Sequence, residues 1–415
     1  MSRTMDRALT LVRSAQGPIA PYLEAFAASL VDQQYSTFCV HHKVYRVAQF
    51  SAWLKRRSRG AAALVVDEAL ADLYLREALS DRTRSRGIAR FELQQLLCFL
   101  RERGLVPAPA SVPADPAGEA IRCFAAHLRE VRGLADRTIE LYCELAVQFL
   151  RSRFGRDPVD MRALLPTDVI EHVQRQAKRM PARRLKLVIT ALRSLLGYGQ
   201  MCGEVLPQIV AAVPSVASWA TTPALPRAIS AEHARLAIES CKLHTPVGRR
   251  DRAVLLLLAR LGLRSGEVAA LLLDDVDWAA GCLRVRGKGG RDGLVPLPPD
   301  VGEAIAAYLQ DGRPASEDRH VFLRSRAPIR AFRNSAVAVA SIVKHALERA
   351  GIDAPHEGAH QFRHALAVGL LRQGASLPEI GELLRHRSSQ VTTVYARVDL
   401  IALRALAPAW PGDAR

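Results

Sequence analysis

Apolar side chains recur every three to four residues along most of this chain, which is the spacing of helices that bury one face. The run from Ile139 to Phe149 is typical. Residues 249–262 are apolar on most sides, which predicts a helix buried nearly all round. The pattern changes at residues 281–298, where CLRVR, a glycine-rich turn and LVPLP predict a short β-sheet. The expected fold is therefore mainly α-helical, with one small antiparallel β-sheet in the C-terminal part.

Two stretches without helical periodicity divide the chain. Residues 105–118 hold four prolines among small residues, and residues 213–230 hold three prolines with several Ser and Thr. Such composition is typical of linkers. A chain of 415 residues is also too long for one ordinary domain. We therefore expect three domains, at residues 1–105, 119–212 and 228–415.

The first two of these segments share short motifs in the same order. Each also places a basic run before its last helix, at residues 82–90 and 178–186. Unrelated helical bundles can share such spacing by chance, but the agreement at both ends of the segments favours an internal duplication. The shared motifs are Phe26-Ala27-Ala28-x-Leu30 with Phe124-Ala125-Ala126-x-Leu128, Gln49-Phe50 with Gln148-Phe149, and Leu96-Leu97-x-Phe99 with Leu195-Leu196-x-Tyr198.

Charge adds a candidate partner to this picture. Lys and Arg number 58 against 41 Asp and Glu, which gives a formal net charge of +17 at pH 7. Such a surplus favours a polyanionic partner, because each phosphate that a basic side chain neutralises releases condensed counterions. On charge alone, an ordinary protein with a basic surface is an equal alternative.

The sequence also indicates a cytoplasmic protein that does not bind a membrane. The N-terminus, MSRTMDRALT, lacks the apolar core of a signal peptide, and the apolar run at residues 254–263 is too short to span a bilayer. Seven cysteines lie scattered without a Cys-x-x-Cys pair, which suggests reduced thiols and neither a zinc ribbon nor a disulfide framework.

Candidate chemistry gathers in the last segment, in four short motifs. Arg264 and Glu267 lie in GLRSGE, where a structural salt bridge between them is the simpler interpretation. Lys288 lies in the glycine-rich turn RGKGGR, where a solvated hairpin tip is the simpler interpretation. A Lys in such a loop can also contact a phosphate or protonate a leaving oxygen. Each of these motifs alone is a weak signal.

The third motif, HQFRH, places His360 and Arg363 three residues apart, on one face of a helix. His356, His360 and His364 recur every four residues, as metal ligands on a helix can do. No cluster of Cys or carboxylate residues completes a ligand set there. The metal interpretation is therefore the weaker one, and we expect neither a metal nor another cofactor.

The fourth motif carries His386 and Tyr395, and alone it suggests only a half-buried packing tyrosine. Taken together, the motifs supply every group that phosphoryl transfer to a tyrosine needs. Two guanidinium groups can clamp the non-bridging oxygens, a His can assist the loss of the phenol's proton, and a Lys can protonate the leaving oxygen. The six candidate catalytic residues are Arg264, Lys288, His360, Arg363, His386 and Tyr395.

With these motifs, the C-terminal segment resembles the tyrosine recombinase (phage integrase) family. The family's conserved boxes are matched in order and spacing by GLRSGEVAALLLDDVDW at 262–278, VRGKGGRDGLVPLP at 285–298 and the stretch from HQFRH to Tyr395 within 360–398. The resemblance implies the family's catalytic fold over 228–415, preceded by a helical core-binding (SAM-like) domain. It also implies site-specific recombination, in which duplex DNA is cleaved and rejoined through a 3′-phosphotyrosyl intermediate.

The resemblance assigns roles to single residues. It implies that Arg264 and Arg363 bind the scissile phosphate, that His386 is a second phosphate-binding donor and that Lys288 is the general acid. It implies that Tyr395 is the nucleophile.

Three further positions match the family's pattern around these residues. The resemblance implies that His360 assists proton transfer, that Glu267 supports the site and that His364 is a supporting histidine. The chain departs from the pattern at Arg385, where the family usually has Gly, and at Ala365, where Thr is frequent. Arg385 is expected to add a phosphate contact or to alter the turn.

The unit at residues 1–105 is a further departure, because the family commonly has one helical domain before the catalytic one. The basic run RTRSRGIAR favours a second DNA-binding unit over a protein-contact module. The extra unit also favours a mobile element over housekeeping resolution. Residues 396–410 are amphipathic enough to dock on a neighbouring protomer or on their own domain.

The resemblance implies double-stranded DNA as the partner and a homotetramer on paired DNA sites. Sibling recombinases and accessory DNA-bending proteins are further candidate partners, and a bacterial protein of this kind is nucleoid-associated when bound to DNA. Two alternatives remain open. One is a type IB topoisomerase-like enzyme, and the other is an inactive DNA-binding relative. The inactive relative should lack at least one of the six candidates, and all six are present.

Overall fold

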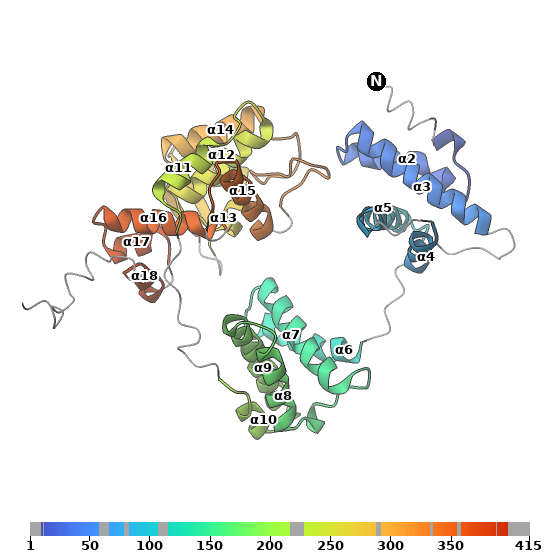
Figure 1. The fold of residues 1–415 in the computed structure, drawn as a ribbon, viewed down its shortest axis with the longest axis horizontal. Helices are drawn as coiled ribbons and strands as arrows, with labels where there is room; N and C mark the ends of the chain where they lie inside the picture. Colours follow the sequence, from blue (N-terminus) through green and yellow to red (C-terminus); the bar gives the residue numbers. More distant parts are fainter. Residues whose placement is uncertain are drawn as a thin grey trace, which may run out of the picture. The chain divides into compact units, whose positions relative to one another are not determined.

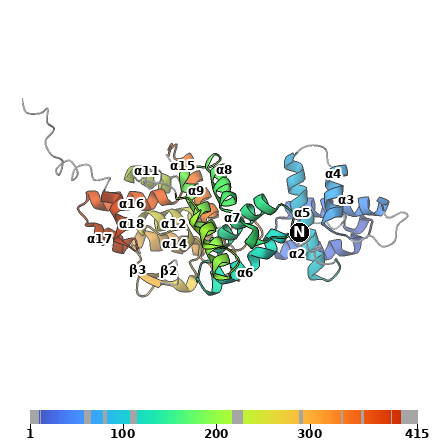
Figure 2. The same ribbon diagram turned by 90° about the horizontal axis from the view of Figure 1, so that it is seen from below.

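The described part of the chain is mainly helical, and its strands form one small antiparallel sheet, as the sequence predicted (Figures 1 and 2). The structure is a computed structural model. No helix among the residues that it describes is long and apolar enough to cross a membrane. It describes residues 10, 12–57, 66–78, 83–106, 115–215, 228–287, 292–332, 335–354, 358–386 and 388–396.

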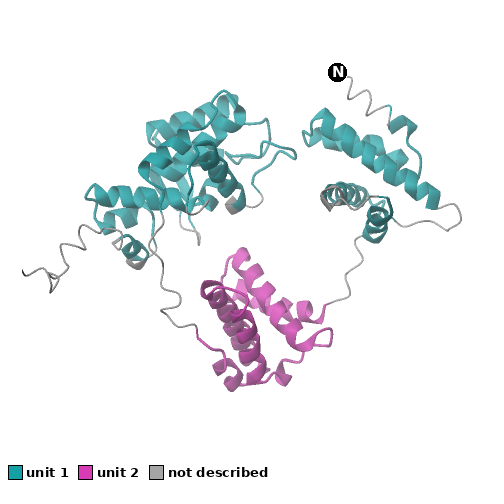
Figure 3. Cartoon of the chain, viewed as in Figure 1, with its two compact units in different colours: residues 1–107, 224–415 teal, residues 108–223 magenta. Residues whose placement is uncertain are grey.

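Two compact units divide the chain (Figure 3). The middle unit comprises residues 108–223, and the other comprises residues 1–107 together with 224–415. We call these last two stretches the N-terminal and the C-terminal segment. Each has its own large cluster of buried apolar side chains. The three-domain division with boundaries at 1–105, 119–212 and 228–415 stays a prediction.

In the N-terminal segment, α-helices pack around a core that includes Phe26, Leu30 and Phe50. Its elements are η1 (Ala20–Tyr22), α2 (Leu23–Asp32), α3 (Thr37–Arg57), α4 (Glu68–Ala78) and α5 (Thr83–Glu102).

The middle unit packs its helices around Phe124, Phe149 and Leu195. Helix starts follow the local sequence: Asp115 caps the first helix by accepting a hydrogen bond from the backbone N–H of Gly118 at 3.0 Å. The elements are α6 (Pro116–Glu130), α7 (Asp136–Phe154), η2 (Met161–Ala163), α8 (Pro166–Ala177), α9 (Ala182–Met201) and α10 (Pro207–Ala211).

Residues of the repeated motifs pack alike in the two stretches. The rings of Phe26 and Phe99 join α2 to α5 with centroids 5.3 Å apart, and those of Phe124 and Tyr198 join α6 to α9 at 5.7 Å. These are corresponding positions of the motifs, and each pair connects the first and the last long helix of its bundle. The duplication stays a prediction, which this shared packing favours.

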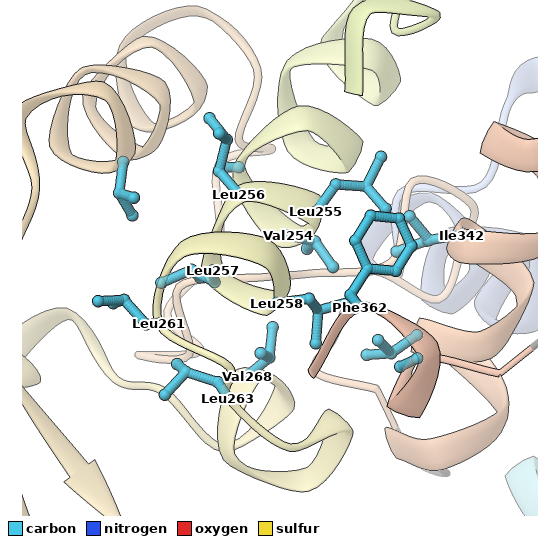
Figure 4. Packing of buried hydrophobic residues seen from close by; sticks show 14 of the residues in the cluster. Val254, Leu255, Leu256, Leu257, Leu258, Leu261, Leu263, Val268, Ile342 and Phe362 are labelled. Atoms are coloured by element: carbon cyan, nitrogen blue, oxygen red, sulfur yellow. The ribbon is translucent and has the colours of Figure 1, made fainter. Parts of the chain in front are cut away.

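In the C-terminal segment, helices α11, α13, α14, α15 and α16 contact α12, whereas α17 and α18 pack on α16 (Figure 1). Val254 to Leu258 on this helix are at most 3% exposed, and they pack with Ile342 and Phe362 of α15 and α16 (Figure 4). The predicted buried helix is thus confirmed. The helices are α11 (Ala231–Glu239), α12 (Pro246–Arg260), α13 (Ser265–Ala269), η4 (Leu273–Asp275), α14 (Pro299–Asp311), α15 (Ser335–Arg349), α16 (His360–Arg372), α17 (Leu377–Leu383) and α18 (Ser389–Ala396).

The sheet of this segment has the order β1-β2-β3, with antiparallel neighbours. Its strands are β1 (Val276–Asp277), β2 (Cys282–Arg286) and β3 (Asp292–Pro296). Val285 pairs with Gly293 next to the β2–β3 turn. Lys288 comes between these two strands in the sequence and lies outside the described residues, as do His356 and the tail beyond residue 396.

Candidate active site

One cavity of about 200 Å³ brings together five of the six residues that the sequence selected. It lies where the start of α13, the face of α16 and the α17–α18 region meet. The sixth residue, Lys288, lies outside the described residues. The cavity is lined by Arg264, His360, Arg363, His364, His386, Val391, Val394 and Tyr395.

Arg264 stands at the N-cap of α13, just after the buried helix α12 ends. Its backbone N–H donates to Glu267 Oε2 at 2.9 Å, and its Nη1 donates to Oε1 of the same carboxylate at 2.7 Å. The salt bridge between Arg264 and Glu267 that the sequence suggested is therefore present. Because the guanidinium also lines the cavity, the salt bridge orients it there.

Glu267 also receives a hydrogen bond from Arg385 Nη2 at 2.9 Å, so that two arginines share one carboxylate. Burial raises the pKa of this carboxyl group. The hydrogen bonds from Arg264 and the positive charges of Arg385 and Arg264 outweigh burial, and the pKa ends below its ordinary value. Glu267 is therefore ionised at neutral pH.

Arg363 is only 4% exposed, on α16. Its Nη1 donates to the carbonyl of Gly262 and its Nη2 to the carbonyl of Leu384, so it ties the α12–α13 loop to the end of α17. Burial and the charge of Arg264 lower its pKa from 12.5 to about 10. The side chain is still a cation at neutral pH, held rigidly at the cavity.

Tyr395 on α18 is 2% exposed, and its hydroxyl lies 2.9 Å from Nδ1 of His364. Burial raises the pKa of the phenol, although the charges of Arg363 and Arg264 oppose this. The phenol therefore keeps its proton at neutral pH, and a base must remove the proton before the oxygen can attack.

Both described histidines nearest the phenol are neutral. The ring of His386 stacks on that of Tyr395, with centroids 6.3 Å apart, and its Nδ1 lies 2.7 Å from Thr392 Oγ1. Burial, followed by the charges of Arg363 and Arg264, lowers the pKa of His386 to about 4. Burial, His360 and Arg363 lower the pKa of His364 likewise to about 4.

The contact between Tyr395 and His364 is a result that the sequence analysis missed. It gave proton transfer to His360 and a supporting place to His364. In the structure His360 lines the cavity, with its ring centroid 5.8 Å from that of His364. The available signal was the spacing of four residues, which puts both rings on one face of α16.

The described residues of this site do not form a metal-binding cluster. Among the described residues, no group of three or more His, Cys, Asp or Glu could hold a metal ion. The candidate trio of histidines includes His356, which lies outside them.

Comparison with known proteins decides the family. The model of the phage integrase family matches residues 228–400. The chain is 44% identical to the putative integrase/recombinase y4rA of Sinorhizobium fredii over 410 residues. This alignment covers 98% of this chain and 98% of y4rA. The chain belongs to the phage integrase, or tyrosine recombinase, family. A second family member, the tyrosine recombinase XerC of Oceanobacillus iheyensis, is 30% identical over 299 residues, or 68% of this chain and 93% of XerC.

Solved structures of tyrosine recombinases share the fold. XerH bound to a palindromic difH substrate aligns with a TM-score of 0.56 and 20% identity, over 76% of this chain and 96% of XerH. A lambda integrase dimer bound to a core site aligns with a TM-score of 0.52 and 16% identity, over 67% of this chain and 94% of the integrase. The predicted fold class, a tyrosine recombinase fold, is thus confirmed.

Proposed function

We propose that this family member is a site-specific DNA recombinase that breaks and rejoins duplex DNA through a covalent bond between Tyr395 and a 3′ phosphate. One observation carries the proposal: the Tyr395 hydroxyl is hydrogen-bonded to a neutral histidine in a cavity that two arginines line. The relatives reported above are integrases and recombinases, which favours this function over a topoisomerase-like one. All six candidates are present, which argues against an inactive relative.

In the cleavage step, the Tyr395 oxygen attacks phosphorus as its proton moves to Nδ1 of His364, while the bond from phosphorus to the 5′ oxygen breaks. Arg264 and Arg363 stabilise the charge that grows on the non-bridging oxygens. When the Thr392 hydroxyl donates a hydrogen bond to Nδ1 of His386, the ring proton is on Nε2, and this N–H can donate to the same phosphate. Lys288 gives the leaving 5′ oxygen its proton.

Rejoining is the reverse of cleavage. A 5′ hydroxyl from the partner strand gives its proton to Lys288 and attacks the phosphorus, and Tyr395 leaves with a proton returned by His364. One phosphoester is exchanged for another at each step, so the chemistry needs no nucleotide hydrolysis. No step calls for a metal ion, and we expect adduct formation to continue in EDTA.

The helical parts of the chain would hold the DNA. Exposed basic side chains on and between α8 and α9 suit the phosphate backbone, and they fit a core-binding role for the middle unit. The N-terminal segment would be a second such unit. The exposed basic residues of the middle unit are Arg175, Lys178, Arg179, Arg183, Arg184 and Lys186.

The proposed assembly is a homotetramer on two paired DNA sites. A lambda integrase tetramer bound to a Holliday junction shares this fold, with a TM-score of 0.52 and 15% identity. Transposition or integration of a mobile element is the proposed context, with sibling recombinases or DNA-bending proteins as further partners.

The experiment that tests the function selects the DNA site from random sequence. Duplexes with a nick inside randomised sequence are incubated with the full chain, so that a cleaved short fragment diffuses away and traps the protein on the DNA. SDS-resistant adducts are then recovered, and their DNA is sequenced. We expect a defined family of sequences, which we call the captured duplexes.

The matched controls replace one tyrosine each. Tyr395→Phe should abolish the adduct, whereas Tyr142→Phe, at a half-buried position of the middle unit, should retain it. An adduct that persists in Tyr395→Phe would overturn the assignment. Relaxation of a supercoiled plasmid that lacks a captured sequence would favour the topoisomerase-like alternative.

A further inference from the structure

Arg385 occupies a backbone position that suits glycine. Its N–H donates to the carbonyl of Glu382 and the N–H of His386 to that of Gly381, both at 2.9 Å, which is the pattern that closes a helix through a left-handed residue. Arg385 is that residue, with φ of 52°. A side chain with a Cβ atom is strained there, so its presence needs a compensating reason.

The side chain of Arg385 reaches from this turn to two other elements. Its Nη2 donates to Glu267 Oε2 on α13 at 2.9 Å. Its stem runs along β3, where a Cβ atom placed on Gly293 would lie 3.4 Å from the Arg385 Cδ. The Nε and Nη1 atoms are buried without a hydrogen-bond partner among the described residues. The hydrogen bond to Glu267 is therefore made although two other nitrogen atoms of the guanidinium group are left without a partner there.

Charge supplies the reason for this contact. Glu267 already accepts two hydrogen bonds from Arg264. In a pair of only these two residues, the negative charge of Glu267 would cancel the positive charge of Arg264. With Arg385 and Arg363 included, three cations face one carboxylate, which leaves two net positive charges. A phosphodiester carries one negative charge, and it gains a second when a deprotonated phenol adds to it. Arg385 therefore offsets the charge of Glu267, so that the charges of Arg264 and Arg363 remain available to the phosphate.

We propose that Arg385 is a positioning residue of the phosphate site, which shares the Glu267 carboxylate with Arg264, fixes it in place and cancels its charge. Arg264 then keeps its own positive charge for the DNA phosphate. This inference rests on the proposed function, because it takes Arg264 to bind the scissile phosphate.

The first test compares Arg385→Gly with Arg385→Lys in the full chain, on the captured duplexes and at saturating protein. The glycine variant removes the charge and also relieves the backbone strain. We expect its rate of adduct formation to fall roughly 10- to 100-fold, with DNA affinity changed less than about threefold. The lysine variant keeps the charge and the strain, and it should recover most of the rate.

The outcome of this comparison separates charge from folding. If Arg385 served only the shape of the turn, the glycine variant would react as fast as the unaltered chain, and the proposal would be wrong. A lysine variant as slow as the glycine variant would equally contradict it. Circular dichroism melting of both variants checks that they are folded.

The second test repeats Arg385→Gly in a Glu267→Gln background. With the carboxylate charge removed, nothing is left for Arg385 to cancel, so its loss should slow adduct formation less than about threefold. An unchanged 10- to 100-fold loss would mean that Arg385 acts on the DNA directly and not through Glu267.

Failure of this inference is distinguishable from failure of the proposed function. If the unaltered chain forms no adduct that depends on Tyr395, both are overturned. If it forms that adduct and Arg385→Gly forms it equally fast, only the inference about Arg385 falls.

Discussion

Burial sets the protonation state of the side chains around Tyr395. The pKa of His364 falls to about 4 through burial and the neighbouring positive groups, and that of His386 falls to about 4 for the same reasons. Burial moves the pKa of the phenol in the opposite direction. Each group is therefore uncharged at neutral pH, and proton transfer from Tyr395 to His364 occurs only as the phenol attacks.

These shifts predict an unusual acid limb of the pH profile. As the pH falls, a histidine base with the ordinary pKa of 6.5 would lose activity tenfold per unit below that value. We expect the rate of adduct formation to stay level from pH 7.5 to about pH 5, because the folded-state pKa of His364 is about 4. Single-turnover rates measure this directly, and a tenfold loss per unit that begins near pH 6.5 would contradict it.

The same shifts fix the sign of the stability change. Since the folded-state pKa of each histidine is depressed, the unfolded chain binds protons first as the pH falls. The free energy of unfolding should therefore decline between pH 6.5 and about 4.

Gly262 is a residue whose substitution should affect both stability and chemistry. It has φ of 57°, and a Cβ atom there would lie 2.6 Å from Cδ2 of Leu384. Its carbonyl also anchors Arg363. We expect Gly262→Ala to destabilise the chain by about 2–4 kcal/mol in urea unfolding and to slow adduct formation.

The matched control for Gly262→Ala is Gly281→Ala. Gly281 has a similar φ of 62°, and a Cβ atom there would meet nothing within 4 Å. The Gly281→Ala variant should lose only about 1–2 kcal/mol of its free energy of unfolding and should form the adduct at an unchanged rate. Equal effects of the two substitutions would show that packing around Gly262 is unimportant.

At the scale of elements, the end of α17 is where a tight turn and the catalytic cavity coincide. Arg385 and His386 are consecutive, and one closes the helix while the other stacks on the tyrosine. We expect Arg385→Gly to be more stable than Arg385→Ala by about 1 kcal/mol, since both lose the guanidinium and only alanine keeps the left-handed strain. Thermal melting of the two variants measures the difference, and an equal or lower melting temperature for the glycine variant would count against the strain.

The elements were largely predictable from the sequence, because their signals are local. The all-round apolar run gave α12, and the glycine-rich turn between two short strands gave β2 and β3. Which described residues line the cavity was largely predictable too, because the resemblance ties residue types to a fixed order of motifs.

The contacts within the site were not predictable, because they depend on how distant elements pack. Which of two histidines on one face of α16 meets Tyr395 is set by the placement of α18. The hydrogen bond between Arg385 and Glu267 joins residues that are 118 positions apart in the sequence. The spacing of apolar residues along the chain cannot predict such a pair.

At the scale of the whole molecule, the open matter is what the N-terminal segment does. The relative y4rA matches 98% of this chain, so the match includes most of that segment. If the segment binds DNA through its basic run, replacing Arg82, Arg84 and Arg86 with Gln should weaken binding of long duplexes. The slope of log affinity against log salt should also become shallower by up to about 3.

Gel-shift titrations at several salt concentrations provide this measurement. Arg101→Gln is the control, because Arg101 lies outside the basic run, is only 18% exposed and is paired with Glu68. An unchanged slope in the triple variant would favour the protein-contact alternative for this segment.

The central claim is that Tyr395 is the nucleophile, and mass spectrometry of the trapped adduct tests it most directly. The adduct formed by the unaltered chain on captured duplexes is digested with nuclease and protease, and the modified peptide is sequenced. The account predicts a nucleotide joined through its 3′ phosphate to Tyr395. A nucleotide on any other side chain, or a linkage through a 5′ phosphate, would contradict it.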